Sequence, residues 1–487
     1  MRVAFIAAEC EPWAKTGGLG DVVDALARSI GRMPGRPVEP VDVYLPRYRS
    51  VRVPDDADGH ELDVPDPSAP GGVARVRLLD VDGDGYRLRL VDRPAAFDRD
   101  RIYDFPDDAA RFGLLCRTAL EAIRRDERPL DVLHLHDWHA CPAVIFRDRP
   151  YSDDPRIGEL ATVLTLHNLA YHGRVPADRV GELGLAPGDG VAPSDGSSLD
   201  LLTQGVERVE LVNTVSPTYA ELARTAAFGF GLDGLLAARG DRFLGILNGL
   251  DPGIWDPADD PALARPYAAD DRSGKAACRA DLLRRLGMDA LDDGPILGAI
   301  GRLDPQKGFD VIVEAGSELA ALGARIVIQA AGDPAIATTI RALEKAHPGR
   351  VVFLERFDRA MARRIYAGVD LLLVPSRFEP SGLVQMIAMR YGTPPVAHAT
   401  GGLVDSIVDE HDHPGAGTGF RFRHATAAGL VWAVGEALDL RGDGTAAPWQ
   451  GLLDRAMAVD FSWDTSAAPA YLAMYRRALR LRGSDAG

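Results

Sequence analysis

The stretch that decides the fold is residues 1–31, MRVAFIAAECEPWAKTGGLGDVVDALARSIG. Residues 3–8 are an apolar run typical of a buried strand, and apolar side chains recur at helical spacing over 19–30 before Gly31 offers a stop. Between them lies a glycine loop, KTGGLGD at 15–21. Paired glycines let a ligand approach the backbone, and a helix start presents N–H donors to an anion. The loop is therefore a candidate anion cradle, with an ordinary strand-to-helix turn as the alternative.

The same alternation of apolar runs and helical patterns continues along the chain. Ten strands are predicted in two series, 3–8, 41–45, 132–135, 162–166 and 211–215, then 296–300, 325–330, 351–354, 371–374 and 395–397. Such alternation predicts an α/β fold of two doubly wound, Rossmann-like domains. The acidic, Pro- and Gly-rich stretch 54–72 is expected to be a surface excursion.

Breaker-rich sequence over 250–272 separates the two series. The predicted domains are therefore an N-terminal one over 1–250 and a C-terminal one over 251–460. A helical segment over 461–487 could pack on either domain, including a return to the first.

Composition narrows the classes of function. The 487 residues include 55 Lys and Arg against 71 Asp and Glu, a net charge of −16, which argues against nucleic-acid and anionic-membrane partners. No run approaches the ~18 apolar residues of a membrane span, and the N-terminal run is too short for a signal peptide. The four cysteines form no C-x-x-C pair, which favours a reducing, cytoplasmic setting.

Two motifs end predicted strands in the first half, HLHDWH at 134–139 and TLHNLAY at 165–171. Three histidines in the first motif suggest a metal site, but no second ligand cluster accompanies them, so no metal is expected. Parallel sheets bind ligands at strand carboxyl ends, which favours Asp137 and His139 as substrate-facing. His167 beside Asn168 is read as ligand-facing rather than as a core histidine.

Two further motifs end strands in the second half. GRLDPQKG at 301–308 delivers Arg302 and Lys307 into one loop, where a planar fork and a point charge suit pyrophosphate; a solvated loop is the alternative. In SRFEPSGL, at 376–383, the carboxylate of Glu379 suits sugar hydroxyls. A glycine pair at 401–402 repeats the logic of the first loop.

No dinucleotide or nucleoside-triphosphate fingerprint is well placed. The sequence has no G-x-x-x-x-G-K-[ST], and its one G-x-G-x-x-G, at 229–234, follows a helical run rather than a strand. A dinucleotide-dependent oxidoreductase is therefore disfavoured.

Together these motifs resemble the glycogen/starch synthase family of GT-B glycosyltransferases, from the first strand to Gly419-Phe420. Blocks at 214–220, 231–236 and 247–251 carry the resemblance further. It implies two domains facing each other across a cleft and transfer of glucose from ADP-glucose to the non-reducing end of an α-1,4-glucan. It also implies retention at the anomeric carbon and no metal or other cofactor.

The resemblance also implies roles for individual residues. Those implied to bind the donor are Lys15, Gly17, Gly18, Asp21, Asn248, Arg302, Lys307, Phe357, Glu379, Ser381, Gly382 and Leu383. Those implied on the acceptor side are Asp137, His139, Asn168 and Tyr171. The catalytic set is His167, Asp137, Glu379, Arg302 and Lys307.

Three positions depart from the family pattern. Ser381 stands where many members have Cys, Gln204 replaces a common Lys, and His172 replaces a common Gln. Each puts one side-chain contact in doubt and leaves the phosphate-binding residues intact. The rival interpretations are a related GT-B enzyme that uses UDP-glucose or makes maltose 1-phosphate, and a catalytically silent glucan-binding regulatory protein.

Overall fold

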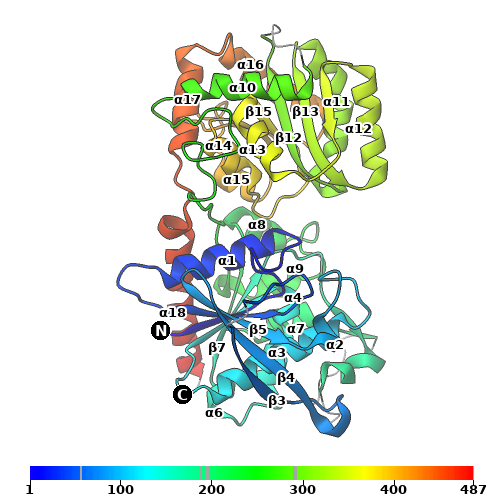
Figure 1. Cartoon of the computed structure of the whole chain (residues 1–487), viewed down its shortest axis with the longest axis vertical. Helices are drawn as coiled ribbons and strands as arrows, with labels where there is room; N and C mark the ends of the chain where they lie inside the picture. Colours follow the sequence, from blue (N-terminus) through cyan, green and yellow to red (C-terminus); the bar gives the residue numbers. More distant parts are fainter. Residues whose placement is uncertain (55–56, 186–188, 190, 192–196, 289–292, 486–487) are drawn as a thin grey trace. The chain divides into compact units, whose positions relative to one another are not determined.

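The computed structural model describes residues 1–54, 57–185, 189, 191, 197–288 and 293–485 (Figure 1). It divides into two compact units: unit 1 is Met1–Gly249 with Trp463–Gly487, and unit 2 is Leu250–Ser462. The sequence-based boundaries at 250/251 and 460/461 lie within a residue or two of these.

Unit 1 is built on a nine-stranded sheet with the order β11-β10-β7-β6-β1-β2-β5-β4-β3. Strands β11 to β5 are parallel, whereas β4 and β3 add an antiparallel edge. The strands are β1 (Val3–Ile6), β2 (Val41–Pro46), β3 (Asp58–Pro65), β4 (Val73–Asp82), β5 (Tyr86–Asp92), β6 (Val132–His136), β7 (Ala161–Leu166), β10 (Leu211–Thr214) and β11 (Phe243–Gly245), with a separate hairpin of β8 (Arg174–Pro176) and β9 (Ser198–Asp200).

The central parallel strands β1, β6 and β7 are short and fully buried, as their apolar runs predict. The helices of unit 1 are α1 (Gly18–Gly31), α2 (Pro94–Phe97), α3 (Asp108–Arg125), α4 (Asp137–Ala140), α5 (Pro142–Asp148), α6 (Pro155–Gly158), α7 (Leu201–Arg208), α8 (Pro217–Ala223), α9 (Asp233–Ala238) and α18 (Ala468–Asp485). Gly31 ends α1 as predicted, and its glycine has a packing reason, because a Cβ there would overlap the carbonyl oxygen of Gly85.

The stretch 54–72 lies within unit 1 and is not a domain boundary, but it contains a strand that was not predicted from the sequence. Eight of its residues form β3, which pairs with β4 at the edge of the sheet. Only Leu62 and Val64 of β3 are buried, while Asp58, Glu61 and Asp63 occupy three of the six other positions, so the segment lacks an apolar run. An edge strand needs to bury one face only, and charges on the other face discourage pairing with other chains.

Unit 2 is built on a six-stranded, wholly parallel sheet with the order β14-β13-β12-β15-β16-β17. Its strands are β12 (Ile296–Leu303), β13 (Arg325–Gly332), β14 (Val351–Leu354), β15 (Leu371–Val374), β16 (Pro395–His398) and β17 (Phe420–Phe422). Its helices are α10 (Ser273–Leu286), α11 (Phe309–Ala321), α12 (Pro334–Ala346), α13 (Arg359–Gly368), α14 (Val384–Arg390), α15 (Gly402–Ser406), α16 (Ala427–Arg441) and α17 (Ala447–Ala458). Helices lie on both faces of the sheet (Figure 1), which makes this a doubly wound domain.

The C-terminal segment returns to unit 1, where α18 lies against β6 and β7. Two buried tyrosines of α18 bond to polar groups inside the sheet: Tyr471 accepts from the Asn213 amide at 3.1 Å, and the Tyr475 hydroxyl lies 2.9 Å from Nδ1 of His134. The helix therefore adds a second partner to each of two buried polar side chains that also bond to Thr165 of β7.

Candidate active site

Three neighbouring strands of unit 1, β1, β6 and β7, place the predicted polar residues at one edge of the sheet. Asp137 follows β6 directly and has a φ of 56°, a left-handed conformation that costs a non-glycine residue about 1–3 kcal/mol. Its carboxylate accepts hydrogen bonds from the backbone N–H groups of His167 (2.7 Å) and Asn168 (3.4 Å). The strained residue thus fixes the position of the loop that follows β7.

Burial controls the charge of these groups. Burial raises the pKa of the Asp137 carboxyl to about 7, against the two backbone hydrogen bonds that lower it, and the nearby charge of Glu9 raises it further. Burial likewise lowers the pKa of His167 to about 3. At neutral pH the His167 imidazole is therefore uncharged, and it can donate or accept a hydrogen bond without carrying charge.

The histidines of this edge hydrogen-bond one another and polar neighbours. Nδ1 of His136 lies 3.0 Å from Nε2 of His167. His134 is engaged at both nitrogens, by Tyr475 and, at 2.7 Å, by the Thr165 hydroxyl. Within the described residues, no group of three or more His, Cys, Asp or Glu side chains is arranged to hold a metal ion.

Glu9 organises the glycine loop, a role that sequence reasoning did not assign to it. Its buried carboxylate accepts hydrogen bonds from the backbone N–H groups of Thr16 (2.6 Å) and Gly17 (2.8 Å) and from the Tyr103 hydroxyl (2.6 Å). Two backbone donors of the loop are thus engaged by the protein itself. Gly18 faces open space, since a Cβ there would meet nothing within 4 Å. The sequence did offer one signal for the role of Glu9, since this carboxylate comes directly after the buried apolar run 3–8.

Tyr103 connects the glycine loop to the Asp137 segment. Besides bonding Glu9, its ring stacks on His139, with centroids 4.9 Å apart and planes 28° from parallel. Tyr103 comes from an irregular segment between α2 and α3. No periodicity or motif marks such a position, so sequence reasoning missed it.

Lys15 and Asp21 are brought together by the glycine loop. The Lys15 ammonium pairs with Asp21 and lies 3.4 Å from the Glu11 carboxylate. The positive charge predicted for the donor phosphate is therefore balanced by two carboxylates in this structure.

The remaining predicted residues of unit 1 have diverse surroundings. Asn168 accepts from the Ala170 N–H at 3.0 Å, which makes it a turn former, whereas the Tyr171 ring is exposed. Asn248 is buried beyond β11, an edge strand two places from β7. Of the family departures, Gln204 bonds within α7, to Glu207 and Arg208, and His172 pairs with Asp200 at 2.6 Å.

In unit 2 the adjacent strands β12 and β15 bring Lys307 and Glu379 together. The Lys307 ammonium donates to the Glu379 carboxylate at 2.7 Å, and the Ser376 hydroxyl donates to the same oxygen at 3.0 Å. The two loops approach closely at Gly308, which has a φ of 68° and whose Cβ would overlap the carbonyl oxygen of Pro375. Glycine is required there on both counts.

Arg302 and Phe357 are not drawn into that pair. The Arg302 side chain is 62% exposed, and its guanidinium lies 3.4 Å from the Asp304 carboxylate. Phe357 is 78% exposed, in the loop after β14, two strands from β12. A cation and a flat apolar ring therefore stand exposed at the carboxyl ends of this sheet.

The turn at Ser381 and Gly382 packs against the second glycine pair. Gly382 has a φ of 76°, and α14 begins two residues later, at Val384. A Cβ at Gly402 would overlap the carbonyl oxygen of Ser381, so packing alone is sufficient to explain this glycine. The buried Ser381 hydroxyl has no hydrogen-bond partner among the described residues.

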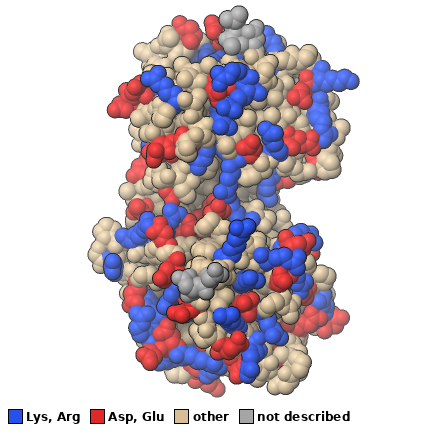
Figure 2. Space-filling view, viewed as in Figure 1, with Lys and Arg blue, Asp and Glu red and all other residues tan. Residues whose placement is uncertain are grey.

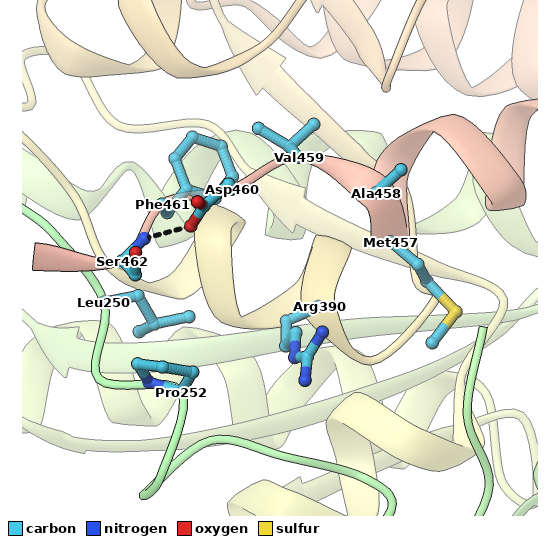
Figure 3. A pocket seen from close by; sticks show the side chains of 9 residues that line it. All are labelled: Leu250, Pro252, Arg390, Met457, Ala458, Val459, Asp460, Phe461 and Ser462. Carbon is cyan, nitrogen blue, oxygen red and sulfur yellow. Dashed lines mark hydrogen bonds between the residues drawn. The ribbon is translucent and has the colours of Figure 1, made fainter. Parts of the chain in front are cut away.

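A cavity of about 270 Å³ in unit 2 contains none of the predicted site residues (Figure 3). Its walls come from the segments at which the chain enters and leaves unit 2 and from the end of α14. The lining residues are Leu250, Pro252, Arg390, Met457, Ala458, Val459, Asp460, Phe461 and Ser462. In each unit the candidate functional residues are therefore those at the strand ends and not those that line this cavity.

Comparisons with known proteins agree along the whole chain. Residues 2–238 match the model of the starch synthase catalytic domain, and residues 294–439 match that of glycosyl transferases group 1. A glycogen synthase of Syntrophotalea carbinolica is 36% identical over 99% of both chains, and one of Paracidovorax citrulli is 38% identical over 98% of this chain and 94% of its own.

Solved structures show the same relationship. The catalytic domain of starch synthase IV from Arabidopsis thaliana, bound to ADP and acarbose, superposes with a TM-score of 0.87 at 32% identity, covering 98% of this chain and 99% of that one. A sucrose-phosphate synthase of Thermosynechococcus elongatus, with a TM-score of 0.60 at 18% identity and 98% coverage of both chains, shares the fold. The chain therefore belongs to the glycogen and starch synthase family, glucosyltransferases with two doubly wound domains of the GT-B type.

Proposed function

We propose that this glucosyltransferase takes glucose from ADP-glucose and adds it, with retention of configuration, to the non-reducing end of an α-1,4-glucan. The observation that carries the proposal is the Lys307–Glu379 pair, which holds a cation and a sugar-hydroxyl acceptor 2.7 Å apart at adjacent strand ends. The related starch synthase IV domain is described as bound to ADP and acarbose, which supports an adenosine diphosphate leaving group and an oligosaccharide acceptor.

The positive charge that the reaction needs comes from unit 2. Negative charge grows on the diphosphate as the glycosidic bond breaks, and preorganised cations stabilise it. Lys307 and Arg302 supply that charge in our proposal, Glu379 binds sugar hydroxyls, and the backbone of Ser381, Gly382 and Leu383 borders the phosphate. The exposed Phe357 ring stacks on the base.

Unit 1 supplies hydrogen-bonding groups, the neutral His167, and a cation, Lys15, that is already paired with carboxylates. In our proposal Lys15, Gly17, Gly18 and Asp21 border the donor together with Asn248, and His139, Asn168 and Tyr171 lie on the acceptor side. The neutral His167 imidazole contacts the sugar at the reacting centre. The Asp137 carboxylate holds the loop of His167 by accepting a hydrogen bond from the His167 backbone N–H.

We propose same-face attack by the acceptor hydroxyl, with the leaving phosphate taking its proton. In this proposal the two carboxylates position and bind groups, since Asp137 accepts two backbone N–H groups and Glu379 accepts the Lys307 ammonium and the Ser376 hydroxyl. Mass spectrometry of enzyme quenched during turnover should find no glucosyl adduct. An adduct on Asp137 or Glu379 would replace this mechanism with a double displacement.

The donor assignment is tested by comparing ADP-glucose with UDP-glucose on glycogen. We expect kcat/KM to be at least about tenfold higher for ADP-glucose, which is the change expected when one contact to the base is lost. A preference for UDP-glucose would overturn the donor assignment. Because Arg302 and Lys307 provide the charge, we also propose that no metal takes part, so that dialysis against EDTA leaves the rate unchanged.

The setting of the reaction is also a proposal. All four cysteines are free and buried in the structure, in keeping with a reducing cytoplasm. Within the described residues, no helix is both long and apolar enough to cross a membrane. Acidic and basic side chains are interspersed on the face of each unit shown in Figure 2, in keeping with a neutral polymer as partner.

A further inference from the structure

Unit 2 carries one exposed tryptophan, Trp432 on α16. All six tryptophans lie in the described part of the chain, and Trp432, at 45% exposure, is the one among them that is exposed. The core-facing side of α16 is supplied by other residues, namely Leu430, Ala433, Val434 and Ala437. Packing of the domain therefore does not account for an indole at this position.

The indole has an ordered polar neighbourhood. The His411 ring meets it edge-on, with centroids 5.1 Å apart and planes 78° from parallel. Nδ1 of His411 lies 3.1 Å from the carboxylate of Glu436, which follows Trp432 by one helical turn. Both polar side chains are about half exposed, so they retain hydrogen-bonding capacity toward a ligand.

The helix surface around Trp432 is open. Gly435 lies beside it on α16, and a Cβ there would meet nothing within 4 Å. Ala428, one turn before Trp432, is exposed and small. No bulky side chain therefore stands at these two positions of α16 beside the indole.

This combination suits a neutral sugar chain. A pyranose presents one face of C–H groups that packs on an aromatic ring, while its hydroxyls both donate and accept hydrogen bonds, here to a carboxylate and an imidazole. The carboxylate of Glu436 disfavours phosphates and other anions. The ring contact and the hydrogen bond described here join these three residues to one another, and none of the three is assigned above to the donor or the acceptor.

We infer that Trp432, His411 and Glu436 form a second α-glucan site on the surface of unit 2, apart from the reacting centre. The inference rests on the proposed glucan acceptor. A polymer with many chains can occupy such a site and the acceptor site at once, and a second contact raises the local concentration of chain ends. A short oligosaccharide cannot use both.

The binding experiment is affinity electrophoresis in native gels that contain glycogen, without any donor. Trp432→Ala should weaken retardation, raising the apparent dissociation constant about 5–20-fold, and Trp432→Phe should lie between this variant and the unmodified protein. Leu322→Ala is the matched control, because Leu322 is an exposed apolar residue of the same unit, at 44% exposure. Unchanged retardation of Trp432→Ala, or equal loss in both alanine variants, would overturn the inference.

Kinetics separate this site from the reacting centre. Trp432→Ala should raise the KM for glycogen about 3–10-fold and leave kcat and the KM for maltotriose unchanged. An equal rise in KM for both acceptors would place Trp432 in the acceptor path of the reaction and contradict a separate site. The electrophoresis needs no turnover, so loss of the proposed activity and loss of this site give different results.

Discussion

The two units prepare their strand-end residues in opposite ways. In unit 1 the key side chains are buried and locked by the protein, as Glu9 holds the glycine loop and Asp137 holds the loop of His167. In unit 2 one buried carboxylate is paired with Lys307, while Arg302 and Phe357 stand in solvent. Unit 1 is thus held in place by hydrogen bonds within the protein, whereas unit 2 combines one preorganised pair, Lys307 and Glu379, with an exposed cation and an exposed ring that a ligand can contact.

The largest effect is expected from removing the preorganised cation of unit 2. Lys307→Ala should lower kcat by roughly 10²–10³, as for loss of one donor to a developing charge. Steady-state kinetics with glycogen would measure it, with Lys345→Ala on α12, an exposed lysine of the same unit, as the control. A loss below tenfold would remove Lys307 from phosphate stabilisation.

The next effect tests the preorganisation of unit 1. Tyr103→Phe removes the bond to Glu9 and keeps the stack on His139, and it should lower kcat/KM about 10–150-fold because a hydrogen bond to a charged group is worth about 1.5–3 kcal/mol. Tyr151→Phe is the matched control, since Tyr151 donates to the buried Glu121 at 2.7 Å, away from the site. Equal losses of activity in the two variants would show that Tyr103 stabilises the fold without a specific role in positioning the glycine loop.

A smaller effect is expected at the exposed ring of unit 2. Phe357→Ala should raise the KM for the nucleotide sugar about 5–20-fold, since stacking on a base is worth about 1–3 kcal/mol, with kcat within about threefold. Phe357→Tyr should retain the unmodified KM. An unchanged KM in the alanine variant would show that this ring does not meet the base.

The smallest effect is one of stability with pH. The folded pKa of Asp137 is about 7, above the ordinary value of 3.8, so its stabilising contribution is complete below about pH 4 and is lost as pH rises through about 7. Asp137→Asn removes this loss. Urea unfolding measures the free energy of unfolding of both proteins. The value for the variant minus the value for the unmodified protein should increase by roughly 1–2 kcal/mol from pH 5 to pH 8. A constant difference would show that Asp137 titrates normally.

The sequence could predict those parts of the fold and of the site that depend on residues close to one another along the chain. The buried parallel strands are recognisable in the sequence as apolar runs. The motifs that contain Lys307 and Glu379 each follow such a strand directly. Since neighbouring parallel strands end at the same edge, proximity within each unit was predictable.

The rest depends on contacts between distant segments. Glu9 and Tyr103 are 94 residues apart, and nothing in either segment signals the other. The alternation of buried and exposed residues in the edge strand β3 is too short to recognise in the sequence, because only Leu62 and Val64 are buried. At Gly402 the sequence suggested ligand approach, whereas the structure shows the backbone of Ser381 packed there, and glycine serves both purposes equally.

The central claim is tested most directly by following glucose from ADP-[¹³C]glucose into glycogen by NMR while measuring released ADP. The account predicts one new α-1,4-linked glucose for each ADP, and loss of both signals in Lys307→Ala. Folded protein that incorporates no glucose from either ADP-glucose or UDP-glucose, or a β-linked product, would contradict it.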